Sequence, residues 1–509
     1  MLERLETKEV NFSEVFNNKD FRVDTDFWTK EPKLNPKLKY DLIGNCLINA
    51  QYGISLSMNE DNKGYPIYRM NEIHNMLCDF EVNKYADITS SELETFKLNN
   101  GDVLFNRTNS YEWVGRTGIY YKQDDRDFIF ASYLVRFIPN QNKILPEYLS
   151  AFLNSKIGVW DVKRRSRQSI NQTNVNPEEV KQIKIPLLGM LFQNKIRDNF
   201  VLASGKLRKS IELYTQAETL LLQEIGFDEA KGYESCGHEE PLEPQSGAHN
   251  VNMKGIASNP DKMTTSMVAK TGIEPNVNVK SFKESFGITG RLDAEYYQKK
   301  YEQYEELVTK NKKGYSYIKN EFELIKTIAK KDKLGYNYIE IGDVNVGDGL
   351  CSFNYILSED LPANAKTIVK KGDILISNVR PYRGAVTIID FEIDDLIVSG
   401  AFTVLREKEN TKFSNEVLKV LLRTSTYKDW LLKFNVGTSY PVIKDEDVLN
   451  LPIPFISEDT KKNITKKIQE SQNLKKQSEQ LLEIAKKAVE IAIEENEEVA
   501  MAFINTNTI

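Results

Sequence analysis

The sequence repeats itself once, with a period of roughly 270 residues, and this duplication limits what the chain can fold into. The segment Gly101-Asp-Val-Leu-Phe-Asn-Arg-Thr-Asn-Ser110 is echoed in its first half by Gly372-Asp-Ile-Leu-Ile-Ser-Asn-Val-Arg380. Further echoes in the same order pair Arg22-Val-Asp-Thr-Asp-Phe-Trp28 with Arg291-Leu-Asp-Ala-Glu-Tyr-Tyr297, Glu147-Tyr-Leu149 with Glu416-Val-Leu418, and Val180, Ile183, Ile185 and Pro186 with Val448, Leu451, Ile453 and Pro454. The period is far longer than a solenoid repeat, so each copy is expected to be a domain with its own core.

The composition is that of an ordinary water-exposed protein with room for more than one core. The chain has 509 residues, of which 40% are apolar and 28% charged, enough for two or more domains. No apolar run is long enough to cross a bilayer, and residues 1–8 lack the pattern of a signal peptide. The four cysteines form no CxxC pair, which argues against a disulfide frame or a zinc site. We therefore expect a cytoplasmic protein without a metal site.

Local patterns predict mixed α and β structure in both copies. Short apolar segments that read as strands are followed by helix signals, above all a proline in the first turn at Pro146 and an Asn-Pro helix start at Asn176. The expected strands are residues 102–105, 118–121, 132–138 and 183–186 in the first copy, and 374–376 and 385–389 in the second. The expected helix after Pro146 covers residues 146–153. The fold class is therefore α+β, duplicated in tandem.

Each copy ends in a long amphipathic helix of the coiled-coil type. Apolar and small residues recur there at steps of three, four and seven, which places them on one face. The residues predicted to pack in the helix pair or against a partner are Leu207, Ile211, Tyr214 and Leu221 in the first copy and Leu474, Leu481 and Ala485 in the second. Small residues at Ser478, Ala485 and Ala488 on the same face predict a close approach of another helix.

These patterns divide the chain into five segments. Residues 228–280 contain one aromatic residue and one leucine and are dominated by Gly, Ser, Asn, Pro and Glu, a composition typical of a flexible linker. The predicted segments are a first domain at 1–190, a central spacer helix at 191–227, the linker at 228–280, a second domain at 281–455 and a C-terminal spacer helix at 456–500.

No catalytic motif is recognisable in the sequence. A Walker loop, a GxSxG elbow, an HExxH motif and the Asp/Asn-Pro-Pro-aromatic motif of an adenine methyltransferase are all missing. Val346-Gly-Asp-Gly349 contains a lone GxG, but no long helix pattern follows it to bind a phosphate, so we interpret it as a turn. We therefore predict no catalytic residues.

The two copies share a strand that leads into a loop of polar, planar and cationic side chains. Arginine can read guanine, asparagine can read adenine, and other polar groups can contact phosphates. The resulting DNA-binding candidates are Arg107, Asn109, Tyr111 and Arg116 in the first copy, Arg380, Tyr382 and Arg383 in the second, and Arg164, Arg165 and Arg167 of the basic run. The alternative is that these are surface loops with ordinary charges and that the basic run is a solvated helix end.

With these motifs and their duplicated order, the chain resembles the DNA-specificity subunit of Type I restriction–modification systems. The resemblance rests on residues 101–110, Arg291-Leu-Asp-Ala-Glu-Tyr-Tyr297 and the Ile183-Lys-Ile-Pro186 ending before a long helix, and it leaves out only residues 228–280. The family usually carries a glycine in the segment before the last helix of each domain. The second copy keeps it in Asn435-Val-Gly-Thr-Ser-Tyr440, which adds Thr438 and Tyr440 as DNA-binding candidates, whereas the first copy has Arg167-Gln-Ser-Ile-Asn171.

The resemblance implies two target-recognition domains, each reading one half of a split, asymmetric site on double-stranded DNA. It implies that the two long helices pack antiparallel, space the half-sites and dock adenine methyltransferase subunits, which bind S-adenosylmethionine, and that a restriction–translocase subunit can join the complex. This chain itself is then expected to bind no cofactor. Two alternatives from other classes are a fused effector with its own nuclease or methylase activity and a protein–protein adaptor built from two repeats.

Overall fold

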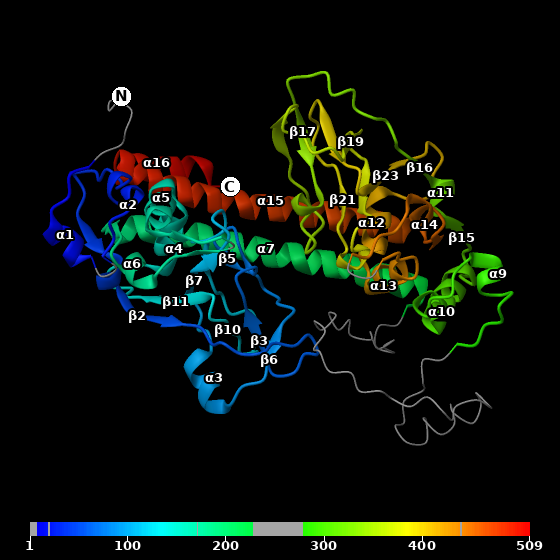
Figure 1. Cartoon of the computed structure of the whole chain (residues 1–509), viewed down its shortest axis with the longest axis horizontal. Coiled ribbons are helices and arrows are strands. Elements are labelled where there is room, and N and C mark those ends of the chain that lie inside the picture. Colours follow the sequence, from blue (N-terminus) through cyan, green and yellow to red (C-terminus); the bar gives the residue numbers. More distant parts are fainter. Residues whose placement is uncertain (1–7, 19–20, 171, 228–277, 438–439, 509) are drawn as a thin grey trace. The chain divides into compact units, whose positions relative to one another are not determined.

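The structure is a computed structural model that describes residues 8–18, 21–170, 172–227, 278–437 and 440–508. The described residues form two compact units (Figure 1), one of residues 1–211 and 471–509 and the other of residues 212–470. Nearly all of the predicted linker, residues 228–277, lies outside the described residues. Within the described part of the chain, no helix combines the length and the apolar character needed to cross a membrane.

The first unit is a set of small sheets covered by short helices. The largest sheet has the strand order β2-β11-β7-β9-β5-β4, and three smaller ones have the orders β10-β3-β6, β12-β13-β8 and β1-β14. The elements are α1 (Phe12–Asn17), α2 (Thr25–Thr29), β1 (Tyr40–Leu42), η2 (Ile43–Cys46), β2 (Leu47–Tyr52), β3 (Tyr65–Tyr68), β4 (Ile73–His74), β5 (Leu77–Cys78), β6 (Tyr85–Ala86), α3 (Ser90–Phe96), β7 (Val103–Asn106), β8 (Thr108–Asn109), β9 (Thr117–Ile119), β10 (Ile129–Phe130), β11 (Leu134–Pro139), α4 (Pro146–Asn154), α5 (Lys156–Arg165), β12 (Arg167–Gln168), β13 (Thr173–Asn174), α6 (Pro177–Lys181) and β14 (Lys184–Pro186).

The second unit repeats this plan with fewer strands. Two four-stranded sheets have the orders β16-β23-β20-β21 and β18-β17-β22-β19, and β15 pairs with β24 as β1 pairs with β14. The elements are α9 (Phe286–Thr289), η4 (Glu295–Tyr297), α10 (Lys299–Thr309), β15 (Tyr315–Tyr317), α11 (Ile318–Glu321), β16 (Phe322–Leu324), β17 (Gly335–Ile339), η5 (Ile341–Asp343), β18 (Asn354–Leu357), β19 (Ala365–Ile368), β20 (Ile374–Ser377), η6 (Pro381–Arg383), β21 (Val386–Ile388), β22 (Leu396–Ser399), β23 (Phe402–Glu407), α12 (Asn415–Arg423), α13 (Ser425–Leu432), α14 (Asp445–Leu449) and β24 (Pro452–Pro454). The predicted α+β class and the tandem duplication are confirmed.

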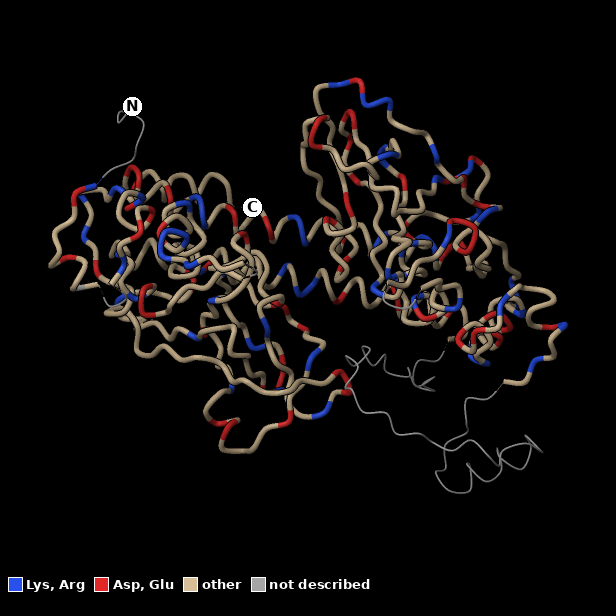
Figure 2. The backbone as a smooth tube through the Cα atoms, in the orientation of Figure 1, with Lys and Arg blue, Asp and Glu red and all other residues tan. Residues whose placement is uncertain are grey.

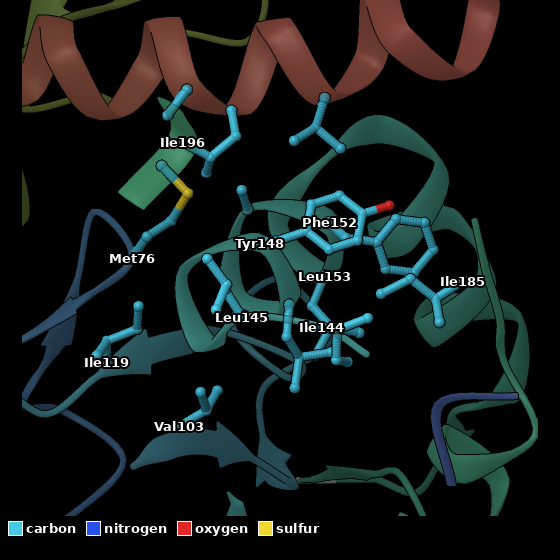
Figure 3. Packing of buried hydrophobic residues seen from close by; sticks show 14 of the residues in the cluster. Met76, Val103, Ile119, Ile144, Leu145, Tyr148, Phe152, Leu153, Ile185 and Ile196 are labelled. Atoms are coloured by element: carbon cyan, nitrogen blue, oxygen red, sulfur yellow. The ribbon is translucent and has the colours of Figure 1, made fainter. Parts of the chain in front are cut away.

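The strand that follows each Gly-Asp pair is buried on both faces. On β7, Val103 and Phe105 enter the main core beside α4, whereas Leu104 enters an aromatic core with Tyr68 and Phe130. Figure 3 shows Val103 in the main core, whose labelled side chains also come from β9, α4, β14 and α7. Because side chains alternate along a strand, two packed faces fix its register, and the residue at which its loop begins is fixed with it.

A clamp between an arginine and two backbone carbonyls occurs at the same place in both units. Arg22 pairs with Asp24 and donates to the carbonyls of Arg165 and Ser166 at 2.9 and 3.4 Å. Arg291 pairs with Asp293 at 2.8 Å and donates to the carbonyls 143 and 144 residues further on, the same separations as in the first unit. Each clamp holds the end of the short helix that precedes the returning strand, which explains why Arg-x-Asp is duplicated.

Each core is completed by parts of both long helices, α7 (Met190–Ile225) and α15 (Glu458–Glu494). In the first unit, one face of each helix enters the core, with Phe192, Ile196, Phe200 and Ala203 from α7 and Leu481, Leu482, Ala485, Ala488, Val489, Ala492 and Ile493 from α15. In the second unit the core takes Ala217, Leu221 and Ile225 from α7 and Ile464 and Ile468 from α15. Neither repeat therefore builds its core from its own contiguous sequence. A further helix, α16 (Glu497–Asn507), follows α15 and contributes to the first core.

Within each unit, the segments of α7 and α15 lie side by side and run antiparallel (Figure 1). The hydroxyl of Ser210 donates to the carbonyl of Ser471 at 2.7 Å, and Ser471 returns the bond to the carbonyl of Ser210 at 2.7 Å. Two turns further along, the hydroxyl of Ser478 donates to the carbonyl of Ala203 at 2.8 Å. Small side chains at these positions let the backbones approach closely enough for these bonds, as the sequence pattern predicts.

The predicted packing residues of the helix pair do not all lie in the cores. Three of them are buried, namely Leu221, Leu481 and Ala485, and three are half-buried, namely Leu207, Tyr214 and Leu474. Ile211 is 42% exposed, so it does not lie in the contact between the two helices. Successive residues of a helix are rotated by about 100°, so with Ser210 at the helix contact, Ile211 points to its side.

We expect the serine contact to tolerate no large side chain. Ser210→Leu places a branched side chain where the two backbones touch, and it should lower the free energy of unfolding by about 1–3 kcal/mol. Ile211→Ala, one residue away but exposed, should change it by less than about 1 kcal/mol. Urea unfolding of both variants measures the difference, and equal effects would contradict the described helix contact.

Candidate nucleic-acid interface

In both units the loop after the doubly buried strand is held by a segment that returns from between two short helices. In the first unit, β8 pairs with β13 and β13 with β12, so Asn109 and Arg167 belong to one small sheet. In the second unit, Val379 bridges to Val442 and Val442 to Val436. The same three-strand frame thus presents two loops of different sequence. Gly101 and Gly372, with φ of +89° and +92°, allow the tight turn that leads into the doubly buried strand of each unit.

The first loop carries two cation–aromatic pairs. The guanidinium of Arg116 lies 3.2 Å from the ring centroid of Trp113, and burial lowers the pKa of Arg116 to about 10. Lys163 lies 4.8 Å from the ring of Tyr111 and donates to the carbonyl of Val114 at 3.0 Å, and burial lowers its pKa to about 8. Tyr111 and Trp113 remain 49% and 41% exposed. The loop therefore presents aromatic rings that are held by cations on their other side.

Two other candidates of the first loop are more enclosed. Arg107 is half-buried, its guanidinium lies 5.2 Å from the ring of Tyr52, and one of its nitrogens donates to the carbonyl of Ser132 at 3.3 Å. The side chain of Asn109 accepts a hydrogen bond from the backbone of Ser110 at 2.8 Å.

The basic run on α5 is mostly interior, which corrects part of the sequence prediction. Arg164 and Arg165 are each 7% exposed, and both pair with Asp161, at 2.8 and 2.9 Å. Arg165 also binds Glu179 at 2.8 Å, and both guanidinium groups lie over the ring of Phe27. They hold α5 against α2 and α6, so the prediction that they contact DNA is wrong. The sequence did not predict this burial because Glu179 and the ring of Phe27, which enclose the two arginines together with Asp161, lie outside α5. Arg167, at the start of β12, is exposed.

The second loop is organised by Arg380. Its φ of +49° is unusual for a residue with a side chain, and its N–H donates to the carbonyl of Pro441 at 2.8 Å. The guanidinium lies 4.7 Å from the ring of Tyr440, which is 64% exposed. Of the other candidates here, Arg383 is exposed and Tyr382 half-buried, and Thr438 lies outside the described residues.

Sequence reasoning missed several residues of these sites. Lys163 and Trp113 complete the aromatic pairs of the first loop. A shallow groove beside the second loop is lined by apolar and neutral polar residues, by Lys326, Lys366 and Lys444, and by Asp445, which pairs with Lys326 at 3.1 Å. No spacing rule links these lysines, because they come from three separate segments. Figure 2 shows that basic and acidic residues alternate along both units, so the charge of a single segment identifies no binding surface.

The buried arginines of α5 provide a direct test of their structural role. Arg165→Met leaves Asp161 and Glu179 buried without this partner, and it should lower the free energy of unfolding by about 3–5 kcal/mol. Arg167→Ala, two residues away on the surface, should change it by less than about 0.5 kcal/mol. Chemical unfolding followed by circular dichroism compares the two. Similar small effects would show that Arg165 is not part of the core.

Comparison with known proteins identifies the family. A family described as "Type I restriction modification DNA specificity domain" matches residues 46–197 and 300–484, one stretch in each copy. Over 178 residues the chain is 30% identical to a protein named as the type I restriction enzyme MjaX specificity subunit, from Methanocaldococcus jannaschii, covering 34% of this chain and 41% of that protein. Over 120 residues it is 32% identical to the type I restriction enzyme EcoKI specificity subunit of Escherichia coli, covering 23% and 25%. The chain thus spans less than half the length of these relatives.

Solved structures of related subunits align along most of the chain but with low scores. The HsdS subunit from Thermoanaerobacter tengcongensis is 13% identical, with a TM-score of 0.27 and coverage of 91% of this chain and 98% of that one. The S subunit of the Type I system from M. genitalium is 10% identical, with a TM-score of 0.36 and coverage of 93% and 97%. The family match covers both copies and confirms the resemblance noted in the sequence. This chain belongs to the family of Type I restriction modification DNA specificity domains.

Proposed function

We propose that this chain is the DNA-specificity subunit of a Type I restriction–modification complex. Each unit reads one half of a split, asymmetric site on double-stranded DNA, and the chain itself catalyses no reaction. The observation that carries the proposal is the pair of frames, equal in construction and different in loop chemistry, within a chain that matches the specificity family in both copies.

The loop chemistry supports two different readings. The first loop offers exposed aromatic rings backed by Arg116 and Lys163, which suits stacking and phosphate contacts. The second offers Arg380 and Arg383, and arginine is the side chain that reads guanine bidentately. Identical loops would read the same bases twice, so the divergence of the loops favours an asymmetric site.

The chemistry of the complex belongs to partner subunits in this proposal. Adenine methyltransferase subunits bring S-adenosylmethionine, and a restriction–translocase subunit is a further partner. We place the complex in the cytoplasm, where its DNA target lies. Helices α7 and α15 act as the spacer between the half-sites and as the docking surface for the methyltransferase.

An exposed apolar stripe on α7 suits this docking. Leu191, Val201 and Leu202 are 72%, 55% and 40% exposed, and they lie within about 100° of one another on the helix. Gly205, on the same side, has open space where a side chain would stand. Exposed apolar residues grouped on one helix face are typical of a surface that packs against another protein.

If each unit reads its own half-site, a substitution in one loop should change base specificity in one half-site only. Arg380→Ala should cost roughly 1–3 kcal/mol at one base position if Arg380 reads guanine, and methylation mapping in cells should show relaxed specificity there only. Tyr111→Ala should affect the other half-site. Loss spread evenly over both half-sites in either variant would contradict reading by separate units. If the chain bound no duplex DNA at moderate salt, with or without methyltransferase, the adaptor function would be favoured instead.

If the methyltransferase docks on α7, a variant of the stripe should lose this partner without losing its own fold. Leu191→Glu together with Leu202→Glu places charge on the stripe, and both positions are exposed, so the chain should fold while co-purification with the methyltransferase falls at least about tenfold. Ile211→Glu is the matched control, because Ile211 is exposed on another side of the same helix. Equal loss of the partner in the control, or full retention in the double variant, would rule out this docking surface.

A further inference from the structure

A single buried arginine joins three distant segments of the second unit. Arg423, the last residue of α12, is 8% exposed. Its Nη1 donates to the carbonyl of Gly384 at 2.9 Å, and its Nη2 donates to the carbonyls of Val346 and Gly347 at 2.9 and 2.8 Å. Its Nε donates to the hydroxyl of Tyr214 on α7 at 2.7 Å.

These contacts fix one end of the second candidate loop. Gly384 caps η6 in the left-handed conformation, with a φ of +72°, directly after Arg383. The start of the same loop is already held, because Arg380 donates to Pro441 and Val379 bridges to Val442. Arg423 therefore supplies the restraint at the far end of the segment that carries Arg380 and Arg383.

Lys419, one turn earlier on α12, strengthens the same arrangement. It is 1% exposed and donates to the carbonyl of Gly349 at 2.7 Å. Gly349 packs so tightly that an added Cβ would lie 2.5 Å from the carbonyl oxygen of Val386, the first residue of β21 after the loop. The turn over residues 346–349, which contains the lone GxG, is thus held by two basic side chains of α12, Arg423 and Lys419.

Because of the partners it binds, Arg423 is expected to add little to the free energy of unfolding. All four acceptors are neutral oxygens. Burying a charged guanidinium costs free energy, and hydrogen bonds to neutral oxygens are not expected to offset that cost in full. A planar group with several fixed donors is well suited to holding several segments at defined distances. The geometry of Arg423 therefore suits a residue that holds the loop and the turn in place relative to α7.

The first unit lacks this device. The duplication places Asn154 of α4 where α12 has Arg423, and Ser150 where it has Lys419. Asn154 donates to the carbonyls of Thr117 and Ser150, at 2.9 and 2.8 Å. These acceptors lie on β9 and α4. Asn154 therefore makes none of the bonds to a long helix that Arg423 makes in the second unit.

We propose that Arg423 is a positioning residue for base reading by the second unit, setting the loop of Arg380 and Arg383 through Gly384 and tying that loop to helix α7 through Tyr214. This inference rests on the proposed DNA-reading function. It makes base discrimination in one half-site depend on a residue that touches no DNA, and on its bond to α7.

The test uses the full chain with its methyltransferase and compares base discrimination in the two half-sites. Methylation mapping of the wild type first gives the site, and duplexes with one substituted base pair in either half then serve as probes. Arg423→Met should lower the affinity ratio between correct and substituted duplexes about tenfold for the second unit's half-site. The ratio for the first unit's half-site should stay unchanged. Arg423→Lys should recover part of the loss, and Tyr214→Phe, which removes only the hydroxyl, should show a smaller loss in the same half.

A matched control separates positioning from stability. Val420→Ala removes buried apolar volume from the same helix without touching the loop, and its unfolding free energy can be compared with that of Arg423→Met. Discrimination lost to the same degree in Val420→Ala would reduce Arg423 to a structural residue and overturn the proposal. So would unchanged discrimination in Arg423→Met, or equal loss in both half-sites. Failure of the wild type to bind any duplex would overturn the proposed function itself, before any variant is compared.

Discussion

The close contact between α7 and α15 is the constraint on which the rest of the structure depends. Reciprocal serine-to-carbonyl bonds at Ser210 and Ser471 bring two helices from opposite ends of the duplication into register. Each core is then closed by residues from both helices. Each core therefore contains side chains from both copies of the duplicated sequence.

Within each unit, a strand buried on both faces turns this packing into a defined loop position. Val103 and Leu104 enter different cores, and Ile374 and Leu375 do the same in the second unit. With register fixed on both faces, the following loop starts from a rigid point, and a returning segment pins it a second time. The scaffold can thus keep its construction while the sequences of the two loops diverge.

Cations serve several purposes in this acidic chain, and burial decides among them. Arg164 and Arg165 neutralise buried carboxylates, Arg116 supports an exposed ring, and Arg423 binds only neutral oxygens among its described partners. A net charge of −6 therefore says little about the surface that meets DNA. What matters is which positive groups stay near solvent after folding.

The sequence by itself determined the duplication, the α+β class, the strands and short helices around residues 101–110 and 372–380, and the long helices with their small residues. These follow from periodicity and from local signals such as Pro146, which act over a few residues. It also determined the family, because motif order survives divergence. Only the tertiary structure decided that Arg164 and Arg165 are interior, that Ile211 points away from the helix contact, and that Lys163 and Arg423 belong to the loops. Burial, ion pairing and hydrogen bonding to distant carbonyls depend on partners far away in the chain, and no local pattern specifies which partners folding will bring together.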